Sequence, residues 1–173
     1  MTGRIFTADH HVYDLPPLLS WNVRHTGTVP CDSWSVTAVY QPEMLTVLRM
    51  AAGFAAIENG MTQLRGIVDE YTVELGSRGM TVTLSGRGYA ARLLDNESRP
   101  VTYEQVTLRE LIRCHAEPYG ISCGAAADLR PTVPYTAGAG ISQWKGISEF
   151  CRTYGGFLPR FAKTGELLAT PEQ

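Results

Sequence analysis

The sequence predicts an α+β protein, an antiparallel β-barrel-like meander with short helical insertions. Two observations predict it. Apolar and polar residues alternate with a period of two through much of residues 33–85, which is typical of half-buried strands. After Ser85 the apolar spacing becomes helical, and Gly and Pro interrupt it. We therefore expect a β-barrel-like domain over residues 1–98 and a helix-containing α+β domain with a terminal hairpin over residues 99–173.

The composition is that of a folded chain without a strong charge. Of 173 residues, 44% are apolar and 18% charged, and the formal net charge is −2. This apolar content is enough for a core, and the near-neutral charge argues against nucleic acid as a partner. No stretch approaches the roughly 18 apolar residues of a membrane span. The sequence also does not open on a charged segment followed by an apolar one, so we predict no signal peptide.

The first half of the chain is predicted to be mostly strand. Alternation of Trp34, Val36 and Ala38 with polar residues predicts the clearest of these strands. We expect this strand to end before Pro42, because proline does not fit inside a central strand. The remaining early elements are strands at residues 12–15 and 54–58 and one or two helical turns at residues 44–50.

Asn59-Gly60 is the strongest hairpin signal, because both turn positions require positive φ. The return strand changes phase between residues 64–68 and 71–75, and a phase change within one strand indicates a β-bulge. Gly66 is the expected place of the bend. Two further elements complete the meander: a turn at residues 76–79 and a strand at residues 80–85.

The second half is predicted to hold three helices and a hairpin. Thr107 and Glu110 form a capping box before an amphipathic helix. Ser142 caps the last helix, and Gly155-Gly156 ends it. The other expected elements are a short helix at residues 89–94, a loop with at most one short strand at residues 121–141, and a terminal hairpin formed by residues 157–162 and 166–169.

Residues 84–88 run from a strand through Gly86-Arg87-Gly88 into the short helix. Helix N-termini bind phosphate, so a nucleotide site is one interpretation. The third glycine and the P-loop lysine of such sites are absent, however. We therefore interpret the segment as a tight strand-to-helix turn.

None of the four cysteines forms a CxxC pair, which excludes the spacing of zinc knuckles and thioredoxin-like motifs. We interpret Cys31, Cys114, Cys123 and Cys151 as reduced thiols that pack as small apolar residues, with Cys114 and Cys151 on apolar helix faces. A nucleophilic Cys–His pair would join Cys114 or Cys151 to His115. Because His115 completes an apolar helical stripe, we expect a packed core histidine instead.

The other candidate groups also have simple structural interpretations. An adjacent His10-His11 pair cannot supply a metal site by itself. The acidic residues near turns and strand ends show no pair placed to face across a cleft, as a glycosidase requires; they are Asp69, Glu70, Asp95 and Glu97. The tryptophans Trp21, Trp34 and Trp144 are expected in the core. We therefore predict no catalytic, cofactor-binding or metal-binding residues, no cofactor and no enzymatic activity.

A series of short motifs runs along residues 30–168. They are CDSWSVT at 31–37, GIVDEY at 66–71, LSGRGYAARLLDNES at 84–98, Thr107-Leu108, YGI at 119–121 and GISQWKGISEF through GGFL at 140–158. In their order and spacing they resemble the phage tail hub family, which includes late-control protein D of contractile-tailed phages and the hub portion of related injection machines.

The resemblance implies a structural role. Such proteins are β-barrel domains with helical insertions, and three copies form a ring at the tail tip that joins the tail tube to the spike and baseplate. The implied partners are copies of the chain itself (a homotrimer), the tail tube and other baseplate or spike proteins, with no nucleic acid and no membrane span. The implied location is the virion tail tip, after assembly in the bacterial cytoplasm.

Family members usually continue into a second barrel after the terminal hairpin, whereas this sequence ends at residues 170–173. The resemblance therefore implies a fragment, a truncated prophage product or a compact variant. Two other functions stay open. One is a tail-associated cell-wall hydrolase that uses Cys114 or Cys151 with His115, and the other is a small cell-wall-binding module with an aromatic-lined groove.

Overall fold

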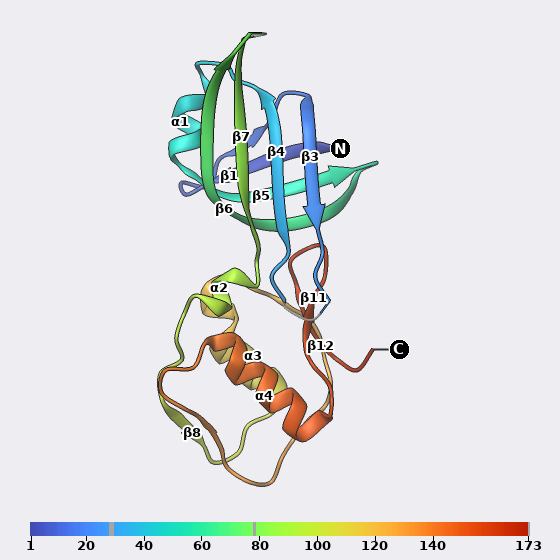
Figure 1. Ribbon diagram of the computed structural model, residues 1–173. Helices are drawn as coiled ribbons and strands as arrows, with labels where there is room; N and C mark the ends of the chain where they lie inside the picture. The colour runs from blue at the N-terminus through green and yellow to red at the C-terminus, as the bar shows by residue number, and fades with distance from the viewer. Residues whose placement is uncertain (28–29, 78, 173) are drawn as a thin grey trace. The chain divides into compact units, whose positions relative to one another are not determined.

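The computed structural model describes residues 1–27, 30–77 and 79–172. They form two compact units, Met1–Tyr89 (unit 1) and Ala90–Gln173 (unit 2), which are described separately (Figure 1). Mostly antiparallel strands combine with a few short helices, which confirms the predicted α+β class.

Unit 1 is one curled sheet with a short helix. Its elements are β1 (Thr2–Thr7), β2 (Val12–Asp14), β3 (Leu18–Arg24), β4 (Ser33–Val39), α1 (Met44–Arg49), β5 (Ala51–Glu58), β6 (Met61–Gly76) and β7 (Gly79–Gly88). The strand order is β2-β1-β5-β6-β7-β4-β3, and every neighbouring pair is antiparallel. Within the described residues β2 and β3 are free edges, so the sheet curls as a barrel does but does not close.

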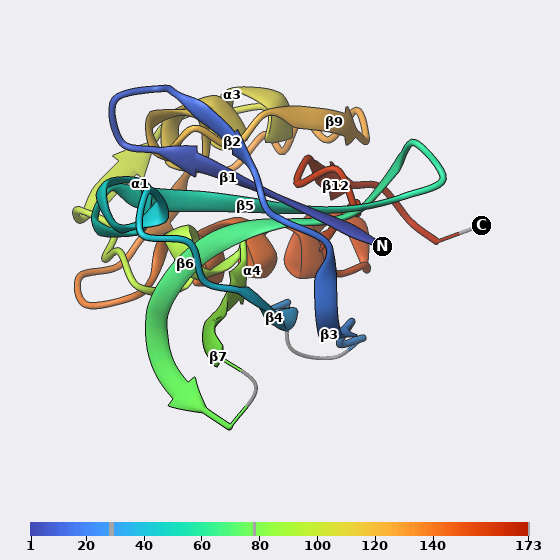
Figure 2. The same ribbon diagram turned by 90° about the horizontal axis from the view of Figure 1, so that it is seen from above.

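The long strand β6 produces the curl. It pairs with β5 from Met61 to Ile67 and with β7 from Gly66 to Gly76, and it follows a strong curve in Figures 1 and 2. Val68 pairs with Gly86 and Glu70 with Ser85, which leaves Asp69 as the extra residue of a bulge. The predicted bulge is therefore confirmed, and it lies at Asp69 rather than at Gly66.

The core of unit 1 lies on the concave face of this sheet. Alternate residues of five strands and two residues of α1 fill it; the largest are Ile5, Trp34, Met44, Leu48, Phe54, Leu64 and Leu84. Asn59 and Gly60 have φ of 51° and 75°, as the β5–β6 hairpin requires. The predicted turn at residues 76–79 includes Arg78, which lies outside the described residues.

Unit 2 packs short strands around two helices. Its elements are α2 (Ala91–Leu94), β8 (Val101–Tyr103), α3 (Leu108–His115), the 3₁₀ turn η1 (Glu117–Tyr119), β9 (Cys123–Ala126), β10 (Tyr135–Ala137), α4 (Gln143–Gly155), β11 (Arg160–Phe161) and β12 (Leu167–Ala169). Strands β8 and β10 pair antiparallel, and β12 joins β11 antiparallel to β9 parallel. The Thr107–Glu110 capping box, the Ser142 cap and the terminal hairpin are all confirmed.

Several expectations need correction. Strands β1 and β3 were not predicted, and residues 121–141 contain two short strands rather than at most one. Gly86, Arg87 and Gly88 are the last residues of strand β7, not a strand-to-helix turn. Trp21 is 50% exposed because it lies on the edge strand β3. Cys114 is exposed because the buried stripe of α3 is formed by other residues, including His115.

Candidate functional site

Residues of three separate motifs meet around Trp34 in unit 1. The indole stacks on Phe54 with ring centroids 3.7 Å apart, and its Nε1–H donates to the Ile67 carbonyl at 3.1 Å. A Cβ on Gly66 would collide with the carbonyl oxygen of Arg87, and one on Gly86 with that of Ile67. Glycine is therefore required at both positions, because β6 and β7 approach each other so closely beside the indole.

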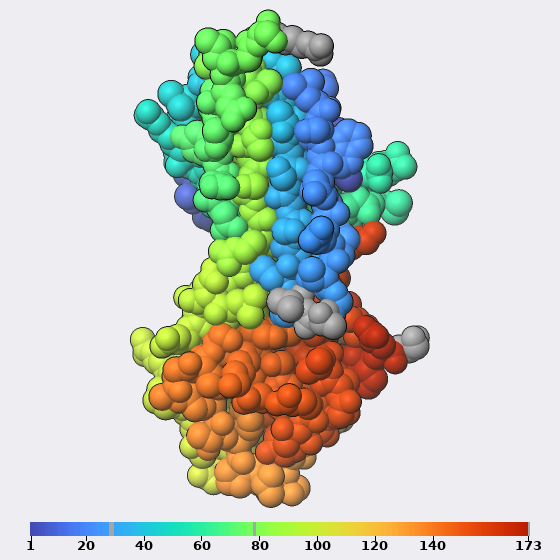
Figure 3. All heavy atoms as spheres, viewed as in Figure 1, coloured from blue at the N-terminus to red at the C-terminus, as the bar shows by residue number. Residues whose placement is uncertain are grey.

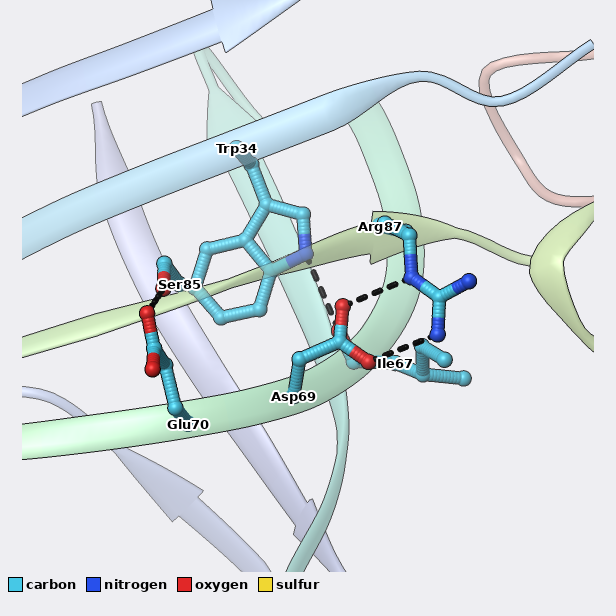
Figure 4. A network of polar contacts seen from close by, with 6 residues as sticks. All are labelled: Trp34, Ile67, Asp69, Glu70, Ser85 and Arg87. Atoms are coloured by element: carbon cyan, nitrogen blue, oxygen red, sulfur yellow. Dashed lines mark hydrogen bonds and ion pairs between the residues drawn. The ribbon is translucent and has the colours of Figure 1, made fainter.

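On the other face of the same strands, the bulge presents two carboxylates to β7. Asp69 binds the Arg87 guanidinium through two hydrogen bonds of 2.9 and 3.0 Å, and Ser85 donates to Glu70 at 3.1 Å (Figure 4). A bidentate pair of this kind fixes geometry as well as charge. Both partners of the Asp69–Arg87 pair are about one-third exposed, so we attribute register and local shape to it rather than much stability.

This polar cluster (Trp34, Ile67, Asp69, Glu70, Ser85 and Arg87) accounts for the first three motifs of the chain. The glycines permit close strands, and the bulge turns Asp69 and Glu70 toward Arg87 and Ser85. Asp69 and Glu70 are exposed, as the sequence predicts. The arrangement is a junction of β4, β6 and β7 held by hydrogen bonds and an ion pair, and we call it the strand junction.

The free edge of unit 1 carries exposed apolar residues. In Figure 3 strands β6, β7, β4 and β3 lie side by side across one face, with β3 at the margin. On β3, Leu19 is 58% and Trp21 50% exposed, and the strand contains neither Lys nor Pro. At the far end of the β6–β7 hairpin, the cross-strand pair Leu75 and Met80 is exposed as well. A sheet edge offers unpaired backbone groups to another chain, and on β3 only Arg24 and the bulge at Leu19 protect against such pairing.

His115 is buried in unit 2, as predicted, and both of its ring nitrogens have partners. Nδ1 lies 2.5 Å from Gln143 Oε1, and Nε2 lies 3.1 Å from the Tyr103 hydroxyl. The Gln143 amide donates to the Glu97 carbonyl at 2.8 Å and to the Tyr119 hydroxyl at 3.1 Å. Sequence reasoning missed Gln143, Tyr103 and Tyr119, because these partners are distant in sequence and show no local pattern.

The two cysteines considered with His115 have different environments. Cys151 is fully buried in the core of unit 2, and burial raises the pKa of its thiol to about 12. Cys114 is exposed, next to Tyr103. The pKa of Tyr103 is raised, mainly by burial and then by the neighbouring Cys114. The structure thus brings Cys114, and not Cys151, to the surface beside the His115 network.

The remaining candidates are dispersed. His10 and His11 are exposed in the turn between β1 and β2, and His11 contacts Asp9 at 3.0 Å. Within residues 1–27, 30–77 and 79–172, no three His, Cys, Asp or Glu side chains gather as metal ligands would. In that same part of the chain, no helix is long and apolar enough to span a membrane.

Comparison with solved structures gives matches along nearly the whole chain. A tail protein from Neisseria meningitidis MC58 aligns with 96% of this chain and 50% of its own, at a TM-score of 0.71 and 15% identity. The 43 kDa tail protein of prophage MuSo2 from Shewanella oneidensis aligns with 96% of this chain and 53% of its own, at a TM-score of 0.72 and 15% identity. The chain thus spans about half the length of these proteins.

Neither protein-family models nor curated proteins match the sequence. The comparison therefore rests on solved structures, and what it compares is the fold. Over 96% of its length, the chain has the fold found in about half of each of these two tail proteins.

Proposed function

We propose that the protein is a non-catalytic structural component of a phage, prophage or phage-tail-like particle. The observation that carries the proposal is the fold match to two tail proteins over 96% of the chain. The finer part of the proposal is a position in the tail-tip or baseplate hub, where the chain joins the tail tube to the spike. The hub-like motifs support it, because three of them build the strand junction around Trp34.

The proposed partners are further copies of the chain, in a homotrimer, together with the tail tube and neighbouring baseplate or spike proteins. The surface of unit 1 supports this. An open sheet has two different free edges, and a contact between unlike surfaces of successive copies generates a ring when the rotation closes. Exposed Leu19 and Trp21 on β3 provide apolar area at such a contact.

The hydrogen bonds of His115 and the burial of Cys151 also agree with a structural role. Both nitrogens of His115 are held by Tyr103 and Gln143, whereas a general base needs a nitrogen within reach of its nucleophile. The pKa of Cys151 is raised by burial, which disfavours the reactive thiolate.

The test is incorporation of variants into particles. Trp21→Glu places a charge on the β3 edge, and Val133→Glu makes the same change at an equally exposed apolar residue of unit 2. Each variant replaces the natural chain in an inducible particle-producing strain, and purified particles are probed with antibody. We expect Trp21→Glu to lower incorporation about tenfold or more, as loss of a central aromatic anchor does, and Val133→Glu to leave it unchanged. Equal incorporation of the two variants, whether high or low, would contradict the proposed interface.

A further inference from the structure

Unit 2 contains a pocket that the structural role does not use. Its volume is about 430 Å³, within the range of small-ligand sites. The floor is formed by His115 and Gln143, which are 4% and 7% exposed. Tyr103 and Tyr119 line the walls, and Glu97 and Arg99 stand at the rim.

The hydrogen bonds of the floor run in one direction. The Gln143 amide nitrogen donates to the Glu97 carbonyl, which fixes the amide orientation and leaves Gln143 Oε1 as an acceptor. His115 Nδ1 must therefore be the donor to Gln143 Oε1, and in neutral His115 the Nε2 atom accepts from the Tyr103 hydroxyl. Gln143 also donates to the Tyr119 oxygen. In the described part of the chain no acceptor takes the Tyr119 hydroxyl hydrogen, so Tyr119 is left as a polarised donor at the end of the chain of hydrogen bonds.

The rim carries two opposite charges that do not neutralise each other. Residues 97–99 are extended beside the start of α4, since Glu97 forms a β-bridge with Ser142 and the Ser98 amide donates to the Ile141 carbonyl. Ser98 is buried, whereas Glu97 and Arg99 on either side of it are exposed and line the pocket. Among the described residues neither side chain forms an ion pair, although both line the same pocket.

We propose that this pocket binds a small zwitterion, a free amino acid or short peptide. Arg99 and the Tyr119 hydroxyl supply donors for the carboxylate, and guanidinium groups suit carboxylates through their planar fork. Glu97 accepts from the ammonium group. The mixed walls of tyrosine, valine and proline contact the rest of the ligand.

The experiment is an amide-detected NMR titration of the full chain. Each proteinogenic L-amino acid, and glycylglycine, is added at millimolar concentration while the signals of Ser98, Cys114 and Tyr119 are followed. The probe that binds best is then compared with two blocked forms, its carboxamide, which lacks the carboxylate, and its N-acetyl derivative, which lacks the ammonium group. The variants are Arg99→Gln and Glu97→Gln, with Arg113→Gln as a control on an exposed arginine outside the pocket.

We expect Arg99→Gln to weaken binding of the amino acid about tenfold, the loss of roughly one charge-assisted hydrogen bond, and to leave binding of the carboxamide unchanged. Glu97→Gln should weaken the amino acid similarly and leave the N-acetyl derivative unchanged, and Arg113→Gln should have no effect. The proposal is overturned if no probe shifts the pocket signals. It is equally overturned if the blocked forms bind as well as the amino acid, or if Arg113→Gln weakens binding as much as the pocket variants do.

Discussion

Unit 1 is a continuous ladder of long antiparallel strands, whereas unit 2 is built from helices and strands of two to four residues. In unit 1 the decisive constraint lies in the backbone, since Gly66 and Gly86 permit two strands to pass beside Trp34. In unit 2 it lies in side chains, since Gln143 links α4 to α3 and to the loop at Glu97. We therefore expect unit 1 to be destabilised most by a substitution at a glycine, and unit 2 by the loss of a buried polar side chain.

The largest expected effect is that of Gly86→Ala in unit 1. The new Cβ collides with the backbone carbonyl of Ile67, and a ladder of paired strands cannot shift without breaking hydrogen bonds. We expect a loss of roughly 3 kcal/mol in the free energy of unfolding, measured by urea denaturation with circular dichroism. Gly27→Ala is the control, because no atom of the residues that the structure describes lies within 4 Å of its added Cβ. Equal stability of the two variants would disprove the close-approach argument.

Gln143→Leu should be the corresponding weak point of unit 2. It removes the partner of His115 Nδ1 and of the Glu97 carbonyl, and both groups lose hydrogen bonds in a largely buried setting. We expect a loss of about 2 kcal/mol and faster hydrogen exchange at the amides of α3 and α4. The exchange rates of β5 and β6 should stay as in the natural chain. If these strands exchanged faster too, the units would not be separate in the way described.

A smaller effect is expected at the N-terminus of α3. Thr107→Ala removes the side chain that accepts from the Glu110 amide at 3.2 Å. The expected cost is about 1 kcal/mol, the usual value of such a cap, and it is measured in the same urea experiment. Thr132→Ala, at an exposed threonine between β9 and β10, provides the comparison. A cost at Thr107 no greater than at Thr132 would show that the cap contributes nothing.

The smallest expected effects concern how stability changes at acidic pH. The pKa of Glu110 is lowered, chiefly by the Thr107 backbone amide, and the pKa of Asp14 is lowered, chiefly by its hydrogen bonds with Arg4. A carboxyl with a lowered folded-state pKa stabilises above its unfolded pKa, and this contribution is lost as pH falls through the folded pKa. We therefore expect each unit to lose a little stability on acidification below the ordinary pKa range of carboxyls. Urea denaturation of Glu110→Gln, Asp14→Asn and the natural chain at a series of acidic pH values would detect it as a weaker loss of stability in the variants, and an unchanged acid dependence in both would contradict the assignment.

Periodicity predicts unit 1 well where one side of a strand is buried. It identified β4, β7, the Asn59-Gly60 turn and the bulge of β6, because alternation and turn chemistry are local. It missed β3, where exposure on both faces removes the alternation, and the hydrophobic character of Trp21 then suggested a core position. The helix caps of unit 2 were predictable for the same local reason.

The candidate sites were less predictable than the elements. Asp69 and Arg87 stand in recognisable motifs, but their pairing depends on the bulge that sets the register of β6 against β7. His115 was expected in the core from its helical stripe, whereas its partners Gln143 and Tyr103 lie on other elements. A β-bridge between Glu97 and Ser142 brings the segment that carries the pocket charges Glu97 and Arg99 to the start of α4, and no local pattern predicts this bridge.

The central claim is tested most directly by immunogold labelling. Particles from an induced culture are labelled with antibody against this chain and viewed in negative stain. The account predicts gold at the tail tip of intact particles. Intact particles without gold, prepared from a lysate that still contains the protein, would contradict it.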